Sequence, residues 1–434
     1  MADTGIRTDN PPPDLPPDFK DDPSIDPYPH YERLRGRCPV AQLDQVCGMR
    51  PFVVTTYPEA RAALADPRLS KDPEVGRQAL VEAGFEHLYF GERASLSHHM
   101  LSADPPDHTR LRKVVAAQFT PRRVAELAPR VQQIADELID DFAGAGHAPT
   151  EQDERIAQTG QAELMAAFAN QLPSLVIAEL LGVPADDRQR FRAWSQDFLR
   201  PTYDPRQAEA AEALTDYLAA QIERKRAQPG ADLLSDLLSS EDQERLDPQE
   251  VLSTAVLLLL AGHETTVNLI GNGLLALLTH PDQYAALCGR PELVPDAVEE
   301  FLRYDGPVER ATLRFAAEKL EIAGTVIPEG SAVYVALNSA NRDHAVYPEP
   351  DRLDVTRTPR GHLAFGHGIH FCLGAPLARL EGRIAFETLL RRLPELRLAV
   401  PVEQLEYRAS TIMRGLEALP VRFTVRKSPV HAND

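Results

Sequence analysis

The stretch that decides the fold is Phe365-Gly-His-Gly-Ile-His-Phe-Cys-Leu-Gly374, in which three glycines bracket Cys372 just before a helical pattern that resumes at Ala375. Glycine lets the backbone approach a bulky planar ligand and adopt conformations that are closed to other residues. The start of a helix favours the thiolate of a nearby cysteine over its thiol. The segment therefore predicts an anionic cysteine beside a ligand site, whereas a buried structural cysteine is the simpler interpretation of Cys38, Cys47 and Cys288.

The composition around this segment is that of a globular protein. The chain has 434 residues, of which 43% are hydrophobic and 26% charged, and this excludes collagen, coiled coil and wholesale disorder. Lys and Arg number 46 against 65 Asp and Glu, a net charge of −19, so the molecule repels polyanions and nucleic acid is not its expected principal partner. The four cysteines form no CxxC pair, which argues against a disulfide framework or a zinc ribbon and favours a reducing cytoplasm.

The N-terminal residues 1–27 are acidic and rich in proline, without the cationic start and apolar stretch of a secretory signal. We expect them to form a tail and residues 28–434 to form one large domain, because no linker-like boundary follows. The most apolar run, Ala255–Gly262, is much shorter than the roughly 20 residues that span a bilayer, and His263 and Glu264 interrupt it. No membrane association is expected.

Hydrophobic periodicity predicts a mainly helical protein with a minor sheet. Apolar residues at three- and four-residue spacing predict helices over Arg122–Phe142, Ala162–Ala169 and Ala208–Arg226. Between Glu318 and Leu337 the pattern alternates and carries β-branched residues, which predicts a small sheet. From Asn341 to Phe371 periodicity is lost, and a stretch of that length inside a compact domain is usually functional.

A second motif, Ala261-Gly-His-Glu-Thr-Thr266, lies in the middle of a helix predicted from about Gln249 to Leu278. Ala261 and Thr265 are four residues apart and share one face. The threonine hydroxyl can bond the carbonyl one turn back and bend the helix, which would open a polar notch in an apolar wall. Taken alone, the pattern also fits a helix with an incidental polar face. A zinc site of the HExxH type is excluded because Val267 occupies the position of the second histidine.

Two further motifs are ambiguous when taken singly. Glu300-Phe-Leu-Arg303 is by itself an ordinary surface ion pair. In Asp104-Pro-Pro-Asp-His-Thr-Arg-Leu-Arg112, Asp104 can cap a helix, and His108 and Arg112 lie four apart on one face. Such a pair suits a ligand carboxylate, although each residue could equally be a solvated surface group.

Together these motifs carry a family resemblance. Phe365, Gly366, Gly368, His370, Cys372 and Gly374 resemble the heme-binding loop of the cytochrome P450 family. All four motifs occur in the family's order, and the likeness covers essentially everything after the first 25 or so residues. The resemblance implies the cytochrome P450 fold and a bound heme b. It also implies that Cys372 is the proximal thiolate ligand of the heme iron, pushing electron density toward dioxygen.

The resemblance also implies roles for other residues. Glu264 and Thr265 match the acid and alcohol that help deliver protons during oxygen activation. The expected partners of the heme propionates are His108, Arg112, Arg314 and His370. Arg352 resembles the third member of a structural triad with Glu300 and Arg303. The other histidine groups, His98-His99 and His362 with His367, are interpreted as ordinary loop residues.

The implied reaction is insertion of one oxygen atom from dioxygen into a C–H or C=C bond, while the other atom leaves as water. No flavin or nicotinamide domain is seen in the sequence, so a ferredoxin and its reductase are the expected electron donors. The cations that could form a docking patch are Arg379, Arg383, Arg391, Arg392, Arg110, Lys113, Arg122 and Arg123. A set of scattered surface charges explains them equally well.

The substrate is expected to be large and partly oxygenated. By family position, the pocket is lined by residues 69–101, 191–208, 257–264, 308–313 and 410–413, which mix apolar side chains with Arg, Glu, Thr and Ser. The residues within these motifs most resemble those of actinobacterial members that tailor macrolides and other polyketides in antibiotic biosynthesis. Our hypothesis is therefore that the enzyme hydroxylates or epoxidises a macrolactone. We expect it to be a monomer in the cytoplasm. Two alternatives stay open. One is a heme-thiolate enzyme of other chemistry (oxidative coupling, peroxide-driven oxidation) or of other substrates (fatty acid, terpene, steroid), and the other is a non-catalytic heme sensor.

Overall fold

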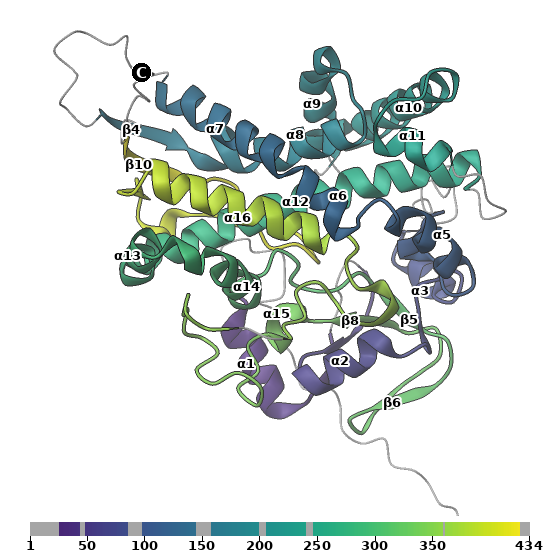
Figure 1. Cartoon of the computed structure of the whole chain (residues 1–434). Helices are drawn as coiled ribbons and strands as arrows, with labels where there is room; N and C mark the ends of the chain where they lie inside the picture. Colours follow the sequence, from purple (N-terminus) through teal and green to yellow (C-terminus); the bar gives the residue numbers. More distant parts are fainter. Residues whose placement is uncertain are drawn as a thin grey trace, which may run out of the picture.

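The computed structural model describes residues 26–43, 48–85, 98–144, 158–198, 205–239, 246–358 and 361–425. Most of the long helices form one layer, and a five-stranded sheet with α1 and α2 forms a smaller part beside it (Figure 1). The expected mainly helical architecture with minor sheet is confirmed. The predicted tail, residues 1–27, lies outside the described residues except for its last two.

The long helix α12, Pro248–Thr279, forms the centre of the helical layer. It starts at a capping box in which Asp247 and Glu250 satisfy each other's backbone N–H groups. Among the described residues, α12 is the one helix long and apolar enough to cross a bilayer, and 72% of its most apolar window is buried inside the protein. A long, predominantly apolar helix that is buried in this way is a core helix.

Helices pack around α12 on several sides. Its neighbours are α8 (Gln171–Leu180), α10 (Pro205–Ala227), α11 (Leu233–Leu238), α13 (Pro281–Gly289), α14 (Val294–Tyr304) and α16 (Ala375–Arg392). The other helices are α1 (Tyr28–Arg37), α2 (Tyr57–Ala65), α3 (Arg77–Glu82), α5 (Asp107–Ala116), α6 (Pro121–Glu126), α7 (Ala128–Gly144), α9 (Arg188–Phe198) and α15 (Leu337–Ala340). Helix α16 lies between α7, α12 and α14, so the residues just before it are brought to the centre of the molecule.

Three small sheets complete the part of the fold that the structure describes. The largest has the order β1 (Val40–Gln42), β2 (Phe52–Val54), β8 (Ala332–Val335), β5 (Arg314–Ala316) and β3 (Leu69–Ser70), with only the β2–β8 pair parallel. The hairpin of β6 (Leu320–Ile322) and β7 (Thr325–Ile327) lies where the sequence predicts a sheet. The third sheet joins β4 (Gln158–Glu163), β10 (Pro420–Val425) and β9 (Arg397–Leu398).

Two helix predictions need correction. The helix expected over 122–142 is divided into α6 and α7, because the Leu127 N–H bonds the Val124 carbonyl in a tight turn that ends α6. The helix expected over 162–169 is wrong. Residues 158–163 form β4, which pairs antiparallel with β10, and only Met165–Ala169 coils, as a π-helical turn. The partner strand lies more than two hundred residues away, so local periodicity cannot reveal it.

Candidate active site

The Cys372 loop is a tight backbone structure immediately before α16. The Cys372 N–H donates to the Phe365 carbonyl at 2.8 Å, which closes the loop. Gly366 and Gly368 have φ values of 74° and 75°, in the left-handed region that favours glycine. A Cβ on Gly368 would also lie 2.9 Å from the carbonyl oxygen of Leu64 in α2. Position 368 therefore requires glycine for two reasons, its positive φ and the close approach of the Leu64 carbonyl.

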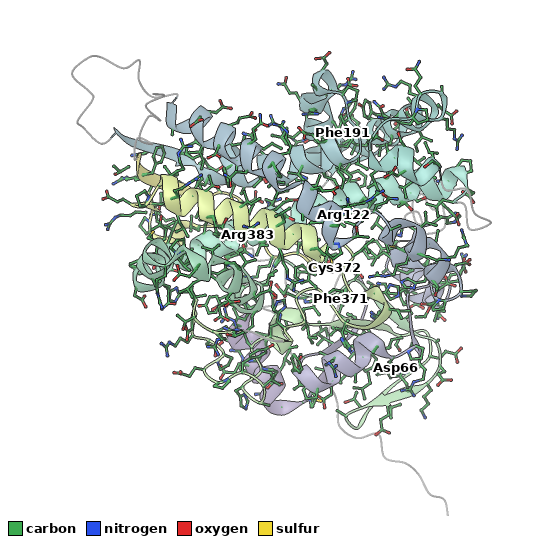
Figure 2. All side chains as sticks on the ribbon, in the orientation of Figure 1. Asp66, Arg122, Phe191, Phe371, Cys372 and Arg383 are labelled. Atoms are coloured by element: carbon green, nitrogen blue, oxygen red, sulfur yellow. The ribbon has the colours of Figure 1, made fainter. Side chains whose placement is uncertain are left out.

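The Cys372 side chain retains exposed surface, although protein surrounds it on most sides. It thus lies on the wall of a concave interior, close to the centre of the molecule (Figure 2). Burial raises the pKa of its thiol, against the opposing effects of the Gly374 N–H and the Arg112 guanidinium. The start of the helix therefore does not by itself bring the pKa of this thiol below its ordinary value. A coordinating metal ion deprotonates a thiol outright.

The structure brings all four predicted propionate partners together. His108 and Arg112 come from α5, Arg314 from β5 and His370 from the loop, and the His108 and His370 ring centroids are 4.4 Å apart. Burial, followed by the charges of Arg314 and Lys71, lowers the pKa of His370 to about 2. Neither the His370 Nε2 nor the Arg314 Nε has an acceptor among the described residues. Unused nitrogen donors beside the charged Arg112 and Arg314 form a site for an anionic ligand.

Sequence reasoning missed Lys71 beside this cluster. The Lys71 Nζ donates to the Thr312 hydroxyl at 2.7 Å and to the Leu313 carbonyl at 2.7 Å. Burial and the nearby Arg314 lower its pKa well below the usual value for lysine. The sequence predicts that Asp104 caps α5, but its side chain makes no such contact. Instead it accepts a hydrogen bond from the Lys71 N–H at 3.0 Å. A lone lysine after a two-residue strand has no periodic signal that would have singled it out.

The predicted polar notch in α12 is present. The Thr265 hydroxyl donates to the Ala261 carbonyl at 2.6 Å, as the sequence predicts. Ala261 is exposed although it lies in the middle of the core helix, so α12 lines a hollow there. Burial raises the pKa of Glu264, and Arg408, whose Nη1 lies 3.9 Å from the Glu264 Oε1, acts against that rise. The sequence did not indicate Arg408.

The structural triad contains Arg357 rather than Arg352. Arg303 donates to both carboxylate oxygens of Glu300, at 2.7 and 2.8 Å, and both side chains are completely buried. The Arg357 Nε donates to the Glu300 Oε1 at 3.2 Å. The Arg352 side chain is exposed. Arg303 contacts only the backbone of this residue, by donating a hydrogen bond to the Arg352 carbonyl at 3.3 Å. The turn closed by the Arg357 N–H and the Asp354 carbonyl carries Arg357 back to the carboxylate, which spacing alone does not reveal.

A second ion-pair network holds the Cys372 loop against α14 and α16. Arg379 binds Glu299 through two hydrogen bonds of 2.6 and 2.8 Å, and its guanidinium lies 4.5 Å from the centre of the Phe365 ring. The His362 Nε2 lies 3.0 Å from the Glu299 Oε2. His362 is therefore a buried, bonded residue rather than an ordinary loop residue. Burial opposes ionisation of Glu299, but Arg379 and His362 lower its pKa to about 2.

The arginines expected to form a cationic patch are largely neutralised. The ion pairs are Arg110–Glu250, Arg122–Glu126, Arg123–Asp236, Arg379–Glu299, Arg383–Glu387, Arg391–Asp136 and Arg392–Asp140. Exposed pairs of this kind leave little net field beyond the contact. The surface is therefore less basic than a count of arginines predicts.

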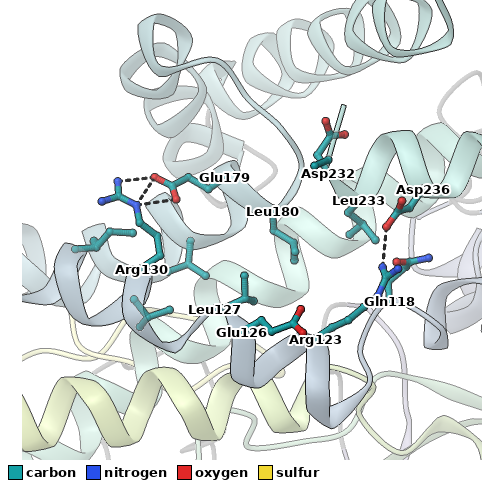
Figure 3. A pocket seen from close by; sticks show the side chains of 14 residues that line it. Gln118, Arg123, Glu126, Leu127, Arg130, Glu179, Leu180, Asp232, Leu233 and Asp236 are labelled. Carbon is teal, nitrogen blue, oxygen red and sulfur yellow. Dashed lines mark hydrogen bonds and ion pairs between the residues drawn. The ribbon is translucent and has the colours of Figure 1, made fainter. Parts of the chain in front are cut away.

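A separate cleft of about 530 Å³ lies between α6, α7, α8 and α11 (Figure 3). Its floor is apolar, and two ion pairs, Arg130–Glu179 and Arg123–Asp236, lie at its rim. Its lining includes neither Cys372 nor Glu264. Because these rim charges are already paired, the cleft adds no group to the chemistry of the site.

The fold and the site define a helical protein with a loop cysteine, a notched core helix and an anion cradle. Comparison with known proteins gives the family: residues 187–288 and 291–400 match the Cytochrome P450 family model. The chain is 50% identical over 403 residues to cytochrome P450 monooxygenase PikC of Streptomyces venezuelae, covering 92% of each chain. It therefore belongs to the cytochrome P450 family, and it is a heme-dependent monooxygenase.

Other relatives have different substrates in their names. Vitamin D(3) 25-hydroxylase of Pseudonocardia autotrophica is 48% identical over 404 residues, and the alignment covers 93% of this chain and 95% of the hydroxylase. The solved structure of the tirandamycin C-bound P450 monooxygenase TamI is 42% identical, with a TM-score of 0.81 over 91% of this chain and 97% of that chain. The cytochrome P450 fold predicted from the sequence is thereby confirmed.

The residues present fit a heme. A thiol lies on the wall of a concave interior, and the exposed Ala261 marks a hollow beside the core helix. The unused nitrogen donors of Arg314 and His370 are those that two carboxylate groups would take. Small residues at Ala261 and in the glycine-rich loop leave space for a planar group, so heme as cofactor agrees with the chemistry of the site.

Proposed function

We propose that this monooxygenase hydroxylates or epoxidises a bulky, partly oxygenated natural product of the macrolide or polyketide class during antibiotic biosynthesis. Relatives named 6-deoxyerythronolide B hydroxylase and mycinamicin IV hydroxylase/epoxidase support the substrate class. The single observation that carries the reaction type is the notch in α12, where an acid and an alcohol line an otherwise apolar hollow. Such a pair supplies protons, which a protein that only senses a ligand does not need.

In this proposal Cys372 would hold the heme by binding its iron through the thiolate sulfur. His108, Arg112, Arg314 and His370 hold the two propionates, and the unused donors of Arg314 and His370 support this assignment. Burial is the main cause of the low pKa of His370, and a carboxylate against these groups would relieve the repulsion from Arg314 and Lys71 that lowers it further. Arg112 also donates to the Phe371 carbonyl at 2.6 Å, which ties the propionate side to the cysteine loop.

Heme, when bound, supplies the activation of dioxygen. The protein's part is proton supply and the exclusion of water. Glu264 has a raised pKa because of burial, so it can carry a proton at a pH closer to neutral than an exposed glutamate can. Thr265 holds its hydroxyl on the Ala261 carbonyl, where it can take that proton and hand on its own. Leu257, Leu258 and Leu259, in the helical turn before the notch, are buried, so α12 is apolar on the approach to it.

The described part of the expected pocket agrees with a mixed substrate. In the segments 308–313 and 410–413, partly buried apolar side chains alternate with hydroxyls such as those of Thr312 and Ser410. Residues 86–97 and 199–204 of the expected lining lie outside the described residues. The mixture favours a molecule with a hydrocarbon skeleton and several oxygen atoms over a plain fatty acid.

Electrons are proposed to come from a separate ferredoxin and its reductase. Phe371 and Ile369 are 39% and 50% exposed on the loop that carries Cys372, and large exposed apolar side chains mark contact surfaces. Because the neighbouring arginines are paired, docking there would depend on apolar contact more than on net charge. A cytoplasmic monomer remains our expectation for the enzyme.

Substrate binding and product analysis test the substrate class. The heme-loaded protein would be titrated with a macrolactone, vitamin D3 and a long-chain fatty acid while the heme absorption spectrum is followed. We expect tightest binding of the macrolactone, and a product one oxygen atom heavier by mass spectrometry after turnover with ferredoxin, reductase and NADPH. Tight binding of vitamin D3 or of the fatty acid alone would contradict the macrolide assignment and leave the monooxygenase standing. A Thr265→Ala variant serves as the catalytic control. Because it keeps Cys372, it should still bind heme and substrate, but it should form less product.

A further inference from the structure

A polar stripe on α12 docks the C-terminal segment of the chain against the core helix. Glu264, Asn268 and Asn272 are spaced four apart and share one face. The Asn272 Nδ2 donates to the Arg414 carbonyl at 2.9 Å. Gly415 approaches so closely that a Cβ there would lie 1.9 Å from the Asn268 Oδ1. Two of the three stripe residues thus contact the segment around residues 408–416.

Glu264 is the end of this stripe that faces the notch, and Arg408 is its partner. The Arg408 Nη1 lies 3.9 Å from the Glu264 Oε1, and the side chains are 29% and 14% exposed. Two hydrogen bonds within the C-terminal turn hold Arg408 in place. Its side-chain Nε donates to the Leu416 carbonyl at 3.3 Å, and its backbone N–H donates to the Gly415 carbonyl at 2.8 Å. The arginine therefore belongs to the C-terminal turn and meets the acid across a short gap.

The other charged groups near this part of α12 act elsewhere. Arg192 of α9 donates to the Gln171 side chain at 2.6 Å and influences His263. The His263 ring faces the Asn170 carbonyl at 3.3 Å, and burial lowers its pKa to about 4, so it is neutral. Among the described residues, Arg408 is thus the charged group that acts on Glu264.

We propose that Arg408 is a positioning residue for proton delivery, holding the Glu264 carboxyl at the mouth of the notch from the C-terminal turn. The inference rests on the proposed role of Glu264. A separation of 3.9 Å exceeds hydrogen-bond length, so Arg408 acts on the carboxyl by electrostatic attraction rather than through a hydrogen bond. Because the anchors of Arg408 are backbone carbonyls, the arginine keeps its place when Glu264 changes charge.

The first test measures the ionisation of Glu264 and needs no turnover. Infrared difference spectra of the heme-loaded protein over a pH series would be assigned with Glu264→Gln. We expect Arg408→Gln to raise the titration midpoint of Glu264 by about one pH unit, because an attractive cation is lost. Arg408→Lys should return the midpoint most of the way, and Arg422→Gln, an exposed arginine on β10, should leave it unchanged. An unaltered midpoint in Arg408→Gln overturns the proposal, whatever substrate the enzyme takes.

The second test asks whether Arg408 acts through Glu264. NADPH-driven turnover of the best-binding compound from the titration series would be compared in H₂O and D₂O, with hydrogen peroxide release measured in parallel. We expect Arg408→Gln to lower kcat several-fold, to enlarge the solvent isotope effect and to leave substrate KM unchanged. The double variant with Glu264→Gln should be no slower than Glu264→Gln alone. If the two losses multiply, or if Arg408→Lys fails to rescue, Arg408 serves the fold or the substrate instead, and the proposal fails.

Discussion

At the level of single residues, the protein moves the pKa of several ionisable side chains away from their values in water. His263, His370 and Lys71 are pushed toward neutrality, first by burial and then by neighbouring cations. Glu381 in α16 is the clearest acidic case, since burial raises its pKa to about 8 and its Oε2 has no partner among the described residues. Each such group makes stability depend on pH.

Glu381 gives a prediction with a definite sign. Because its pKa in the folded protein, about 8, exceeds the ordinary value of 4.5 for a glutamate, the folded state keeps a proton that the unfolded state loses. Its contribution therefore falls as the pH rises from 4.5 to 8, by up to about 1.4 kcal/mol per pH unit. Glu381→Gln should flatten this dependence, so that the variant gains stability relative to the parent between pH 6 and pH 8. Chemical denaturation at pH 6 and pH 8 measures the free energy of unfolding of parent and variant. An equal change in this free energy between the two pH values for both proteins would refute the raised pKa of Glu381.

At the level of elements, the loop between Asn341 and α16 is held by two ion-pair networks rather than by regular structure. Glu300 with Arg303 and Arg357 secures its first part, and Glu299 with Arg379 and His362 secures the part next to the cysteine. Both carboxylates come from α14, so one helix positions the whole loop. The loop's stability should therefore respond to these partners and not to exposed charges nearby.

The Arg357 assignment distinguishes two arginines five residues apart. Arg357→Ala should destabilise the protein by about 1–3 kcal/mol, because a buried carboxylate loses a charged donor. Arg352→Ala is the matched control and should change stability by less than about 0.5 kcal/mol, since its side chain is exposed. Thermal unfolding of the heme-loaded protein compares them. A larger loss in Arg352→Ala would restore the triad expected from the sequence.

The glycine loop gives a second prediction at this level. Gly368→Ala should cost about 1–3 kcal/mol and weaken heme retention, because the position has a φ of 75° and a Cβ would press on the Leu64 carbonyl. Gly36→Ala in α1 is the control, since a Cβ there meets nothing within 4 Å. Heme transfer to apomyoglobin and thermal unfolding report the two effects. Equal retention by both variants would show that the loop tolerates a side chain.

At the level of the whole molecule, net charge and local charge have different consequences. The total of −19 governs behaviour toward polyanions, but the arginines near the cysteine end are mostly engaged in ion pairs. Apolar side chains, Phe371 and Ile369, are what this loop offers a partner. An electron donor that docks here would therefore meet a surface of mixed character.

Redox coupling should accordingly depend more on Phe371 than on salt. Between about 0.05 and 0.3 M salt we expect ferredoxin-supported turnover to fall by less than about threefold, because paired charges give little steering. Phe371→Ala should raise the KM for ferredoxin severalfold, whereas Val346→Ala, with a similar exposed fraction of 38% against 39%, should not. Steady-state kinetics with varied ferredoxin decide the matter. A steep loss with salt would revive the cationic patch.

The sequence by itself determined the family, the helical class and the site residues that lie within compact motifs. The cysteine loop, the α12 notch and the His108 helix could be interpreted locally, because each is a short pattern whose geometry follows from helix periodicity or glycine conformation. The four propionate partners come from three separate places in the chain, and they could be named together only because the resemblance supplied the connection.

Only the tertiary structure decided which distant groups meet. Arg357 replaces Arg352 at Glu300, Lys71 joins the cation cluster, Arg408 faces Glu264, and β4 forms where a helix was expected. Each of these contacts joins residues brought together by chain folding, with no periodicity between them. Burial, which sets the ionisation of Cys372, Glu264 and His370, is likewise a property of the assembled core, because desolvation depends on all the atoms that surround a group.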